Sequence, residues 1–85
     1  MKVYVSAIRD DRSVNMDIMV FRQIEEAQEY LIGAYKLYSP GIGLSASEED
    51  VVAFTAAIKN TGYFYDGVRY YAIFVRNLED KGDQE

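Results

Sequence analysis

The chain has 85 residues, the length of one small domain, because half of it would be too short to bury a core of its own. It contains neither cysteine nor histidine, which excludes disulfide frameworks, thiolate or histidine metal sites and imidazole base catalysis. The formal net charge is −5, and no basic cluster of the kind that binds nucleic acid is present.

Two strands are predicted near the N-terminus, because residues 2–9 and 14–21 both alternate in hydrophobicity. The first run has Val3, Val5 and Ala7 on one side and Tyr4, Ser6 and Ile8 on the other. In the second run, the pattern predicts three inward side chains, Met16, Ile18 and Val20. The polar segment 10–13 between them, DDRS, favours a turn, so the two runs form a β-hairpin.

Two helices are predicted in the middle of the chain. Apolar residues recur at spacings of three and four over residues 23–38, and Gly33 inside this run suggests close approach to another element. The segment SPGIG, residues 39–43, ends the first helix. A second helix is expected over 48–60, with Ser47 or Ser45 as its N-cap and Gly62 after its end.

The C-terminal part predicts a second hairpin. Asp66-Gly67 lies between β-prone runs and is typical of a type I′ turn. The strand at 68–76 is apolar on both faces, which favours a central position beside the first strand. The order β-β-α-α-β-β predicts an α+β fold, an antiparallel four-stranded sheet with two helices packed on one face. We expect a single domain over 1–78 and an acidic, flexible tail over 79–85.

The stretch GYFYDGVRYYAIFV, residues 62–75, holds half of the chain's eight tyrosines and four phenylalanines. A sheet covered by helices on one side needs only one apolar face, so this surplus predicts an exposed aromatic surface for a partner. We expect Tyr4, Ile8, Phe64 and either Tyr70 or Tyr71 on that open face. The candidate contact residues are Tyr4, Tyr63, Tyr65, Tyr70 and Tyr71 in the sheet, with Ile42 and Leu44 in the loop between the helices.

No motif for catalysis or cofactor binding is found. The segment GIGLS lacks the lysine of a phosphate-binding loop, and the acidic residues match no calcium-loop spacing. We therefore expect a protein without enzymatic activity, cofactor or metal. No apolar run reaches the ~18–20 residues that span a bilayer, and no signal peptide precedes the first strand, which favours a cytoplasmic protein without membrane contact.

Three short segments, KVYV at 2–5, VF at 20–21 and EEA at 25–27 followed by Tyr30, resemble a recurrent pattern in small phage and bacterial proteins of unassigned activity. The similarity covers residues 1–38. It implies a short phage or mobile-element accessory protein that binds and modulates a host protein, such as a defence component. The resemblance transfers no catalytic residue, and the long loop and second helix depart from the pattern.

Two alternatives stay open. The chain could be a homodimeric structural domain that uses the same aromatic surface or an edge strand. It could also bind single-stranded nucleic acid by stacking bases on the sheet tyrosines, although the negative net charge argues against this partner.

Overall fold

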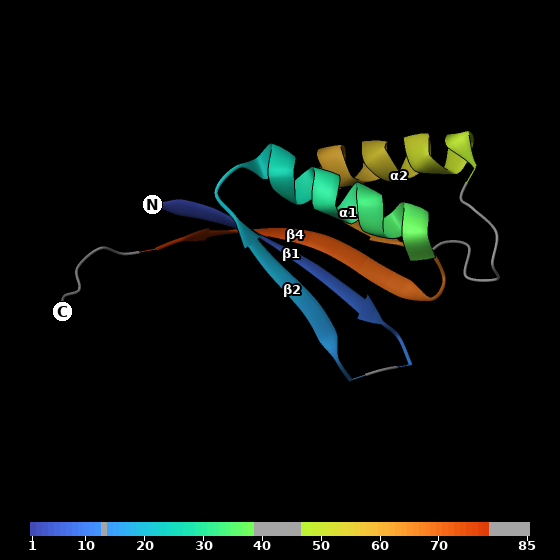
Figure 1. Ribbon diagram of the computed structural model, residues 1–85, viewed down its shortest axis with the longest axis horizontal. Coiled ribbons are helices and arrows are strands. Elements are labelled where there is room, and N and C mark those ends of the chain that lie inside the picture. The colour runs from blue at the N-terminus through green and yellow to red at the C-terminus, as the bar shows by residue number, and fades with distance from the viewer. Residues whose placement is uncertain (13, 39–46, 79–85) are drawn as a thin grey trace.

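The computed structural model describes residues 1–12, 14–38 and 47–78. Its elements are β1 (Lys2–Asp10), β2 (Met16–Phe21), α1 (Ile24–Tyr38), α2 (Glu48–Thr61), β3 (Tyr63–Tyr65) and β4 (Arg69–Asn77). The strands form one antiparallel sheet in the order β2-β1-β4-β3, and both helices lie on the same side of it (Figure 1). The predicted α+β fold and the pairing of the last strand with the first are confirmed. The predicted contacts Ile42 and Leu44, and the tail at 79–85, lie outside the described residues.

The core lies between the helices and one face of the sheet. Helix α1 buries Ala27, Leu31 and Tyr35, which are spaced by four residues and so share one side of the helix. Tyr35 stacks on Phe54 of α2 with ring centroids 4.3 Å apart, and Tyr71 of β4 meets Phe54 edge-on at 5.0 Å. Such ring pairs contribute about 0.5–1.5 kcal/mol each beyond the burial of their area.

A close crossing of α1 over β1 decides which face of the sheet the helices cover. The Ser6 hydroxyl donates to the Ala27 carbonyl oxygen over 3.1 Å, and both residues are fully buried. Because these two side chains are small, the helix can approach the strand closely at this point. The even-numbered residues of β1, Tyr4 and Ile8 among them, therefore face the helices, and the odd-numbered residues face away.

This arrangement corrects part of the predicted facing. Met16, Ile18 and Val20 were predicted to point inward, and the structure places them on the face away from the helices, about half exposed. Conversely, Tyr4, Ile8 and Phe64 were predicted on the open face and lie on the helix side. Ile8 belongs to the core cluster, and Phe64 packs against it. The reason is that β2 is apolar on both faces, so its own pattern does not specify the facing. The Phe21 ring settles it by packing 5.6 Å from Tyr30 of α1.

Both ends of α2 follow the predicted chemistry. The Ser47 hydroxyl accepts a hydrogen bond from the Asp50 N–H at 3.1 Å, which makes Ser47 the N-cap. Gly62 ends the helix with φ of 74°, the left-handed conformation that glycine adopts without strain. The prediction for Gly33 was wrong, because a Cβ built there would have no neighbour within 4 Å.

The turn between β3 and β4 differs from the predicted type I′ turn. Tyr65 pairs with Tyr70, so the two central residues are Gly67 and Val68 instead of Asp66 and Gly67. The Asp66 carboxylate accepts from the N–H groups of Val68 and Arg69, at 2.8 and 2.7 Å. Aspartate therefore holds the turn from its flank, and only Gly67, with φ of 99°, needs the conformational freedom of glycine.

Candidate functional site: the open face of the sheet

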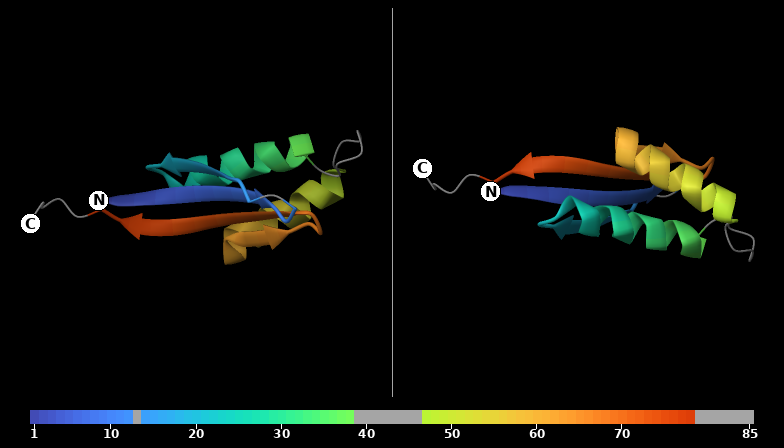
Figure 2. Two further views of the ribbon diagram at one scale, coloured as in Figure 1. Left: turned by 90° about the horizontal axis from the view of Figure 1, so that it is seen from below. Right: turned by 90° about the horizontal axis from the view of Figure 1, so that it is seen from above.

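The side of the sheet away from the helices carries no other element among the described residues (Figure 2). We call this surface the open face. It is formed by alternate residues of all four strands: Val3, Val5, Ala7, Arg9, Met16, Ile18, Val20, Tyr63, Tyr65, Tyr70, Ala72, Phe74 and Arg76. The strand register aligns most of them in three rows across the sheet, Met16-Arg9-Tyr70-Tyr65, Ile18-Ala7-Ala72-Tyr63 and Val20-Val5-Phe74.

Large apolar side chains are exposed in every row. Ile18 is 55% exposed, Val20 58% and Phe74 44%, and Met16 and Tyr63 are similarly open. Four strands at ~4.8 Å and three rows at ~6.8 Å give these rows an extent of roughly 14 by 14 Å. Single exposed apolar residues occur on every protein surface and indicate nothing. Contiguous apolar patches are uncommon on a monomer and mark binding sites.

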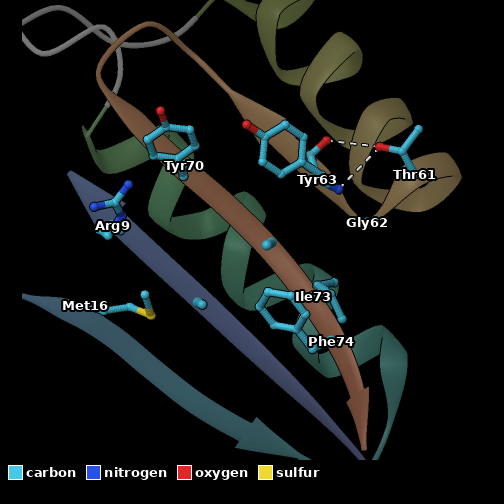
Figure 3. Close-up of a pocket in the computed structure, with 10 residues that line it drawn as sticks. Arg9, Met16, Thr61, Gly62, Tyr63, Tyr70, Ile73 and Phe74 are labelled. Atoms are coloured by element: carbon cyan, nitrogen blue, oxygen red, sulfur yellow. Dashed lines mark hydrogen bonds between the residues drawn. The ribbon is translucent and has the colours of Figure 1, made fainter. Parts of the chain in front are cut away.

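The centre of the open face is hollow. Ala7 and Ala72 lie directly opposite each other on the two central strands. Because an alanine side chain ends at its Cβ atom, no side chain projects far from the sheet at this point. Larger side chains surround them, with Arg9 and Tyr70 at one end, Phe74 at the other, and Met16 and Tyr63 at the sides (Figure 3). The hollow has a volume of about 480 Å³. Ligand pockets in proteins span ~300–1,000 Å³, so an apolar group of a partner has room here.

The strand positions of the open face carry two cations and no carboxylate. The Arg9 guanidinium lies over the Tyr70 ring, 5.0 Å from its centroid, and that of Arg76 lies 5.5 Å from the centroid of Phe74. The ion pair between Arg69 and Asp10, at 3.8 Å, lies on the helix side. The strand positions of the face therefore carry two positive charges although the whole chain carries −5, and the Asp11 carboxylate lies at the Tyr65 end of the face.

The tyrosines at one end of the face form a fixed group. The Tyr65 and Tyr70 rings stack with centroids 4.3 Å apart, and Arg9 packs on Tyr70. The Tyr65 hydroxyl donates to the Asp11 carboxylate in the turn after β1, over 2.8 Å. This hydrogen bond, together with the negative charge of Asp11, raises the pKa of Tyr65 to about 12. Stacking and the hydrogen bond hold both rings in place before any partner arrives.

Five sheet tyrosines were predicted as contacts, and the structure separates them. Tyr63, Tyr65 and Tyr70 lie on the open face. Tyr4 is half-buried on the helix side. Tyr71 is fully buried in the core and cannot be a contact, because alternation along β4 turns it toward the helices whenever Tyr70 faces away.

The sequence analysis did not identify several other residues of the open face. Ala7 and Ala72 shape the hollow by being small, and β2 supplies Met16, Ile18 and Val20. An alanine has no surface signal in a sequence, and only the strand register brings these two together. Arg9 could have been found, since it belongs to the same alternating set as Val3, Val5 and Ala7.

Comparison of the chain with protein-family models, with curated proteins and with solved structures found no match in any of the three. Among the described residues, no helix combines the length and apolar character needed to cross a membrane. The same residues contain no group of three or more acidic side chains placed to hold a metal ion.

Proposed function

We propose that this chain is a binding module without catalytic activity, and that it docks a partner protein on the open face. The observation that carries the proposal is the exposure of apolar side chains in all three rows of that face. The helices already cover the other side, so these side chains do not contribute to the core. Leaving them in water forgoes roughly 25 cal/mol for each Å² that a partner would cover.

The hollow is the proposed anchor point. Binding energy in protein interfaces concentrates in a few large side chains that fill central, well-shielded pockets. Ala7 and Ala72 provide the floor of such a pocket, and Phe74, Met16 and Tyr63 provide its apolar walls. We infer that a leucine or aromatic side chain of the partner inserts between them.

Charge and width define the partner further. Arg9 lines one end of the hollow, and Arg76 lies beside Phe74, beyond the other end, so carboxylates on the partner would be attracted to both. The rows are ~14 Å wide, close to the ~10–12 Å diameter of a helix with its side chains. The proposed occupant is thus an amphipathic helix with an apolar stripe flanked by Asp or Glu.

The resemblance of residues 1–38 to small phage and bacterial proteins suggests the setting. On this basis we expect the amphipathic helix to belong to a host protein in the cytoplasm. Binding would then modulate the activity of that host protein. This part of the proposal rests on the resemblance alone, whereas the docking surface rests on the geometry of the sheet.

Selection from a displayed library of random peptides tests the docking surface without knowledge of the natural partner. Peptides retained by the wild type should share apolar residues at spacings of three and four together with Asp or Glu. Their affinity should fall at least tenfold for Ala72→Arg, which fills the hollow. Arg9→Glu should weaken the acidic peptides selectively, and added salt should reduce that difference.

The matched control is Val52→Arg. Val52 is 67% exposed on α2, on the opposite side of the molecule, so this variant adds the same charge without touching the open face. It should bind the selected peptides as the wild type does. Peptides without a shared pattern, or equal retention by Ala72→Arg, would contradict the proposal, provided circular dichroism shows that the variant is folded.

Single-stranded nucleic acid is a second candidate, favoured by the three tyrosines beside Arg9. Two of these rings are already stacked on each other, and Tyr70 is covered by Arg9 on the open face, which leaves less ring surface for a base. This candidate predicts oligonucleotide binding that falls steeply with salt and is lost in Tyr63→Ala. The protein partner predicts no such binding.

A further inference from the structure

Within residues 1–12, 14–38 and 47–78, no strand pairs with the outer edge of β2, and this edge lacks the usual protection of an edge strand. Natural edges carry lysines, prolines or bulges, or are very short, because an open apolar edge pairs with other chains. β2 runs for six residues, MDIMVF, with Asp17 as its single charge. Met16, Ile18, Met19 and Val20 are each at least 44% exposed, so both faces of the strand are apolar at this edge.

The hydrogen-bond pattern shows which residues of β2 point their backbone groups outward. Met1 and Leu78 exchange hydrogen bonds in both directions, and the Asp11 N–H donates to the Val68 carbonyl oxygen. The odd-numbered residues of β1 therefore bond to β4, and the even-numbered ones bond to β2. Since each even residue of β1 pairs with an odd residue of β2, the odd residues of β2 bond inward. The outward N–H and C=O groups belong to Met16, Ile18 and Val20.

We propose that β2 pairs with β2 of a second copy of this chain, antiparallel about a two-fold axis at Ile18. In this register Ile18 faces Ile18 of the second copy in a hydrogen-bonded pair, and Met16 faces Val20. Every outward-pointing residue of the strand is then paired. Asp17 lies opposite Met19, so the two carboxylates do not meet.

Other registers fit less well. Centring the axis on Asp17 would place two carboxylates directly opposite each other, which is destabilising. Centring it on Met19 would leave Met16 without a hydrogen-bonded partner inside the strand. A shift by one residue would turn the open face of one copy toward the helix side of the other. The sequence of β2 is thus self-complementary in one antiparallel register.

The opposite edge explains why assembly stops at two copies. β3 has three residues, which is short for an edge and offers little backbone to a further chain. Pairing through β2 consumes the long edge of both copies, so the assembly closes as a symmetric dimer. All helices then lie on one side of a continuous sheet, and both open faces lie on the other.

Sedimentation equilibrium on three proteins tests the proposal. The chain mass is 9.7 kDa, and at micromolar concentration the wild type should sediment with about twice this mass. Ile18→Pro should be monomeric and folded, because it removes an outward N–H and no hydrogen bond within the sheet. Ile18→Thr is the control, because it also replaces the isoleucine side chain but keeps the backbone N–H group. This variant should remain a dimer.

A cross-link tests the register and does not depend on the proline variant. The chain has no cysteine, so introduced thiols are unique. Asp17 and Met19 would face each other in a non-hydrogen-bonded pair, the closer of the two pair types, so Asp17→Cys/Met19→Cys should oxidise to a covalent dimer. Asp17→Cys alone should not, because its counterpart lies two residues away along the strand.

The inference would be overturned by a monomeric wild type at high micromolar concentration, by a dimer that survives Ile18→Pro, or by equal cross-linking of the single and double cysteine variants. Loss of the dimer in Ala72→Arg would also overturn it, since that substitution alters the open face and leaves the β2 edge intact. None of these measurements involves a peptide ligand, so they are independent of the proposed function.

Discussion

Two phenylalanines on opposite sides of the sheet provide the most direct check of the open face. Phe54 of α2 is fully buried against Tyr35 and Tyr71, whereas Phe74 of β4 is 44% exposed on the open face. The same substitution to alanine at each position removes the same atoms from two different surroundings. We expect the losses in free energy of unfolding to differ about threefold or more.

The magnitudes follow from burial. Phe54→Ala leaves a cavity in a packed core, and such changes cost about 3–5 kcal/mol. A domain of this size is stable by roughly 4–13 kcal/mol, so this variant should lose a large fraction of its stability. Full burial of a phenylalanine contributes about 1.5–3 kcal/mol, and Phe74 is little more than half buried with water free to fill its place. Phe74→Ala should therefore cost about 1 kcal/mol.

Urea denaturation followed by far-UV circular dichroism measures both values. The measurement should be repeated over a range of protein concentrations, because any dimer would add a concentration-dependent stability. Equal losses at the two positions, at all concentrations, would refute our reasoning. They would mean that Phe74 is as well covered as Phe54 in a single chain and that the open face does not exist.

Three further predictions concern local features. Gly33→Ala should stabilise the protein by up to about 1 kcal/mol in the same assay, because the new Cβ meets no neighbour and alanine favours the helix; destabilisation would reveal an unrecognised contact. Ser6→Ala should cost about 0.5–1.5 kcal/mol, since it removes the hydrogen bond to Ala27, and a neutral effect would show that this bond does not hold α1 on the sheet. NMR titration of tyrosine ring carbons should place the pKa of Tyr65 at about 12 instead of the ordinary 10.0, and Asp11→Asn should lower it toward the ordinary value. Because the folded-state pKa is the higher one, this bond stabilises the fold fully below pH 10 and its contribution is lost as the pH rises toward 12; titration of Tyr65 near its ordinary pKa in the wild type would contradict the hydrogen bond.

The order and type of the elements could be predicted from the sequence because each depends on local chemistry. Alternation predicts β1 and β2, spacings of three and four predict the helices, and Ser47 and Gly62 mark the ends of α2 at the positions observed. The central place of β4 also follows from a local property, since a strand that is apolar on both faces is typical of the middle of a sheet.

The facing of β1 and β2 could not be predicted in the same way. Both strands alternate, but each presents apolar groups on both sides, so alternation alone allows two solutions. The choice depends on the contact between Ser6 and Ala27, where two small residues let α1 lie close to the sheet. A serine in a strand usually indicates the solvent side, and here burial of the hydroxyl is possible because the Ala27 carbonyl oxygen accepts its hydrogen bond.

The candidate site was only partly accessible to sequence analysis for the same reason. The surplus of aromatic residues was visible in the sequence, but the hollow depends on the pairing of Ala7 with Ala72. These two residues are 65 positions apart in the sequence (72 − 7) and lie directly opposite each other in the strand register. Neither alanine is informative alone. The two alanines form a hollow only because the large side chains of Phe74 and Tyr70 lie at its ends, and this arrangement becomes known only when the register is known.

The two proposed surfaces share β2, and this makes their connection testable. Ile18 and Val20 present side chains to the open face and backbone groups to the free edge, so pairing of two copies would bring two hollows onto one continuous face. A tethered pair of selected peptides should then bind the wild type more tightly than a single peptide, through effective concentration. Ile18→Pro should remove this advantage. If the tethered pair gains as much with Ile18→Pro as with the wild type, the dimer is not what joins the two faces, because a monomer offers a single hollow.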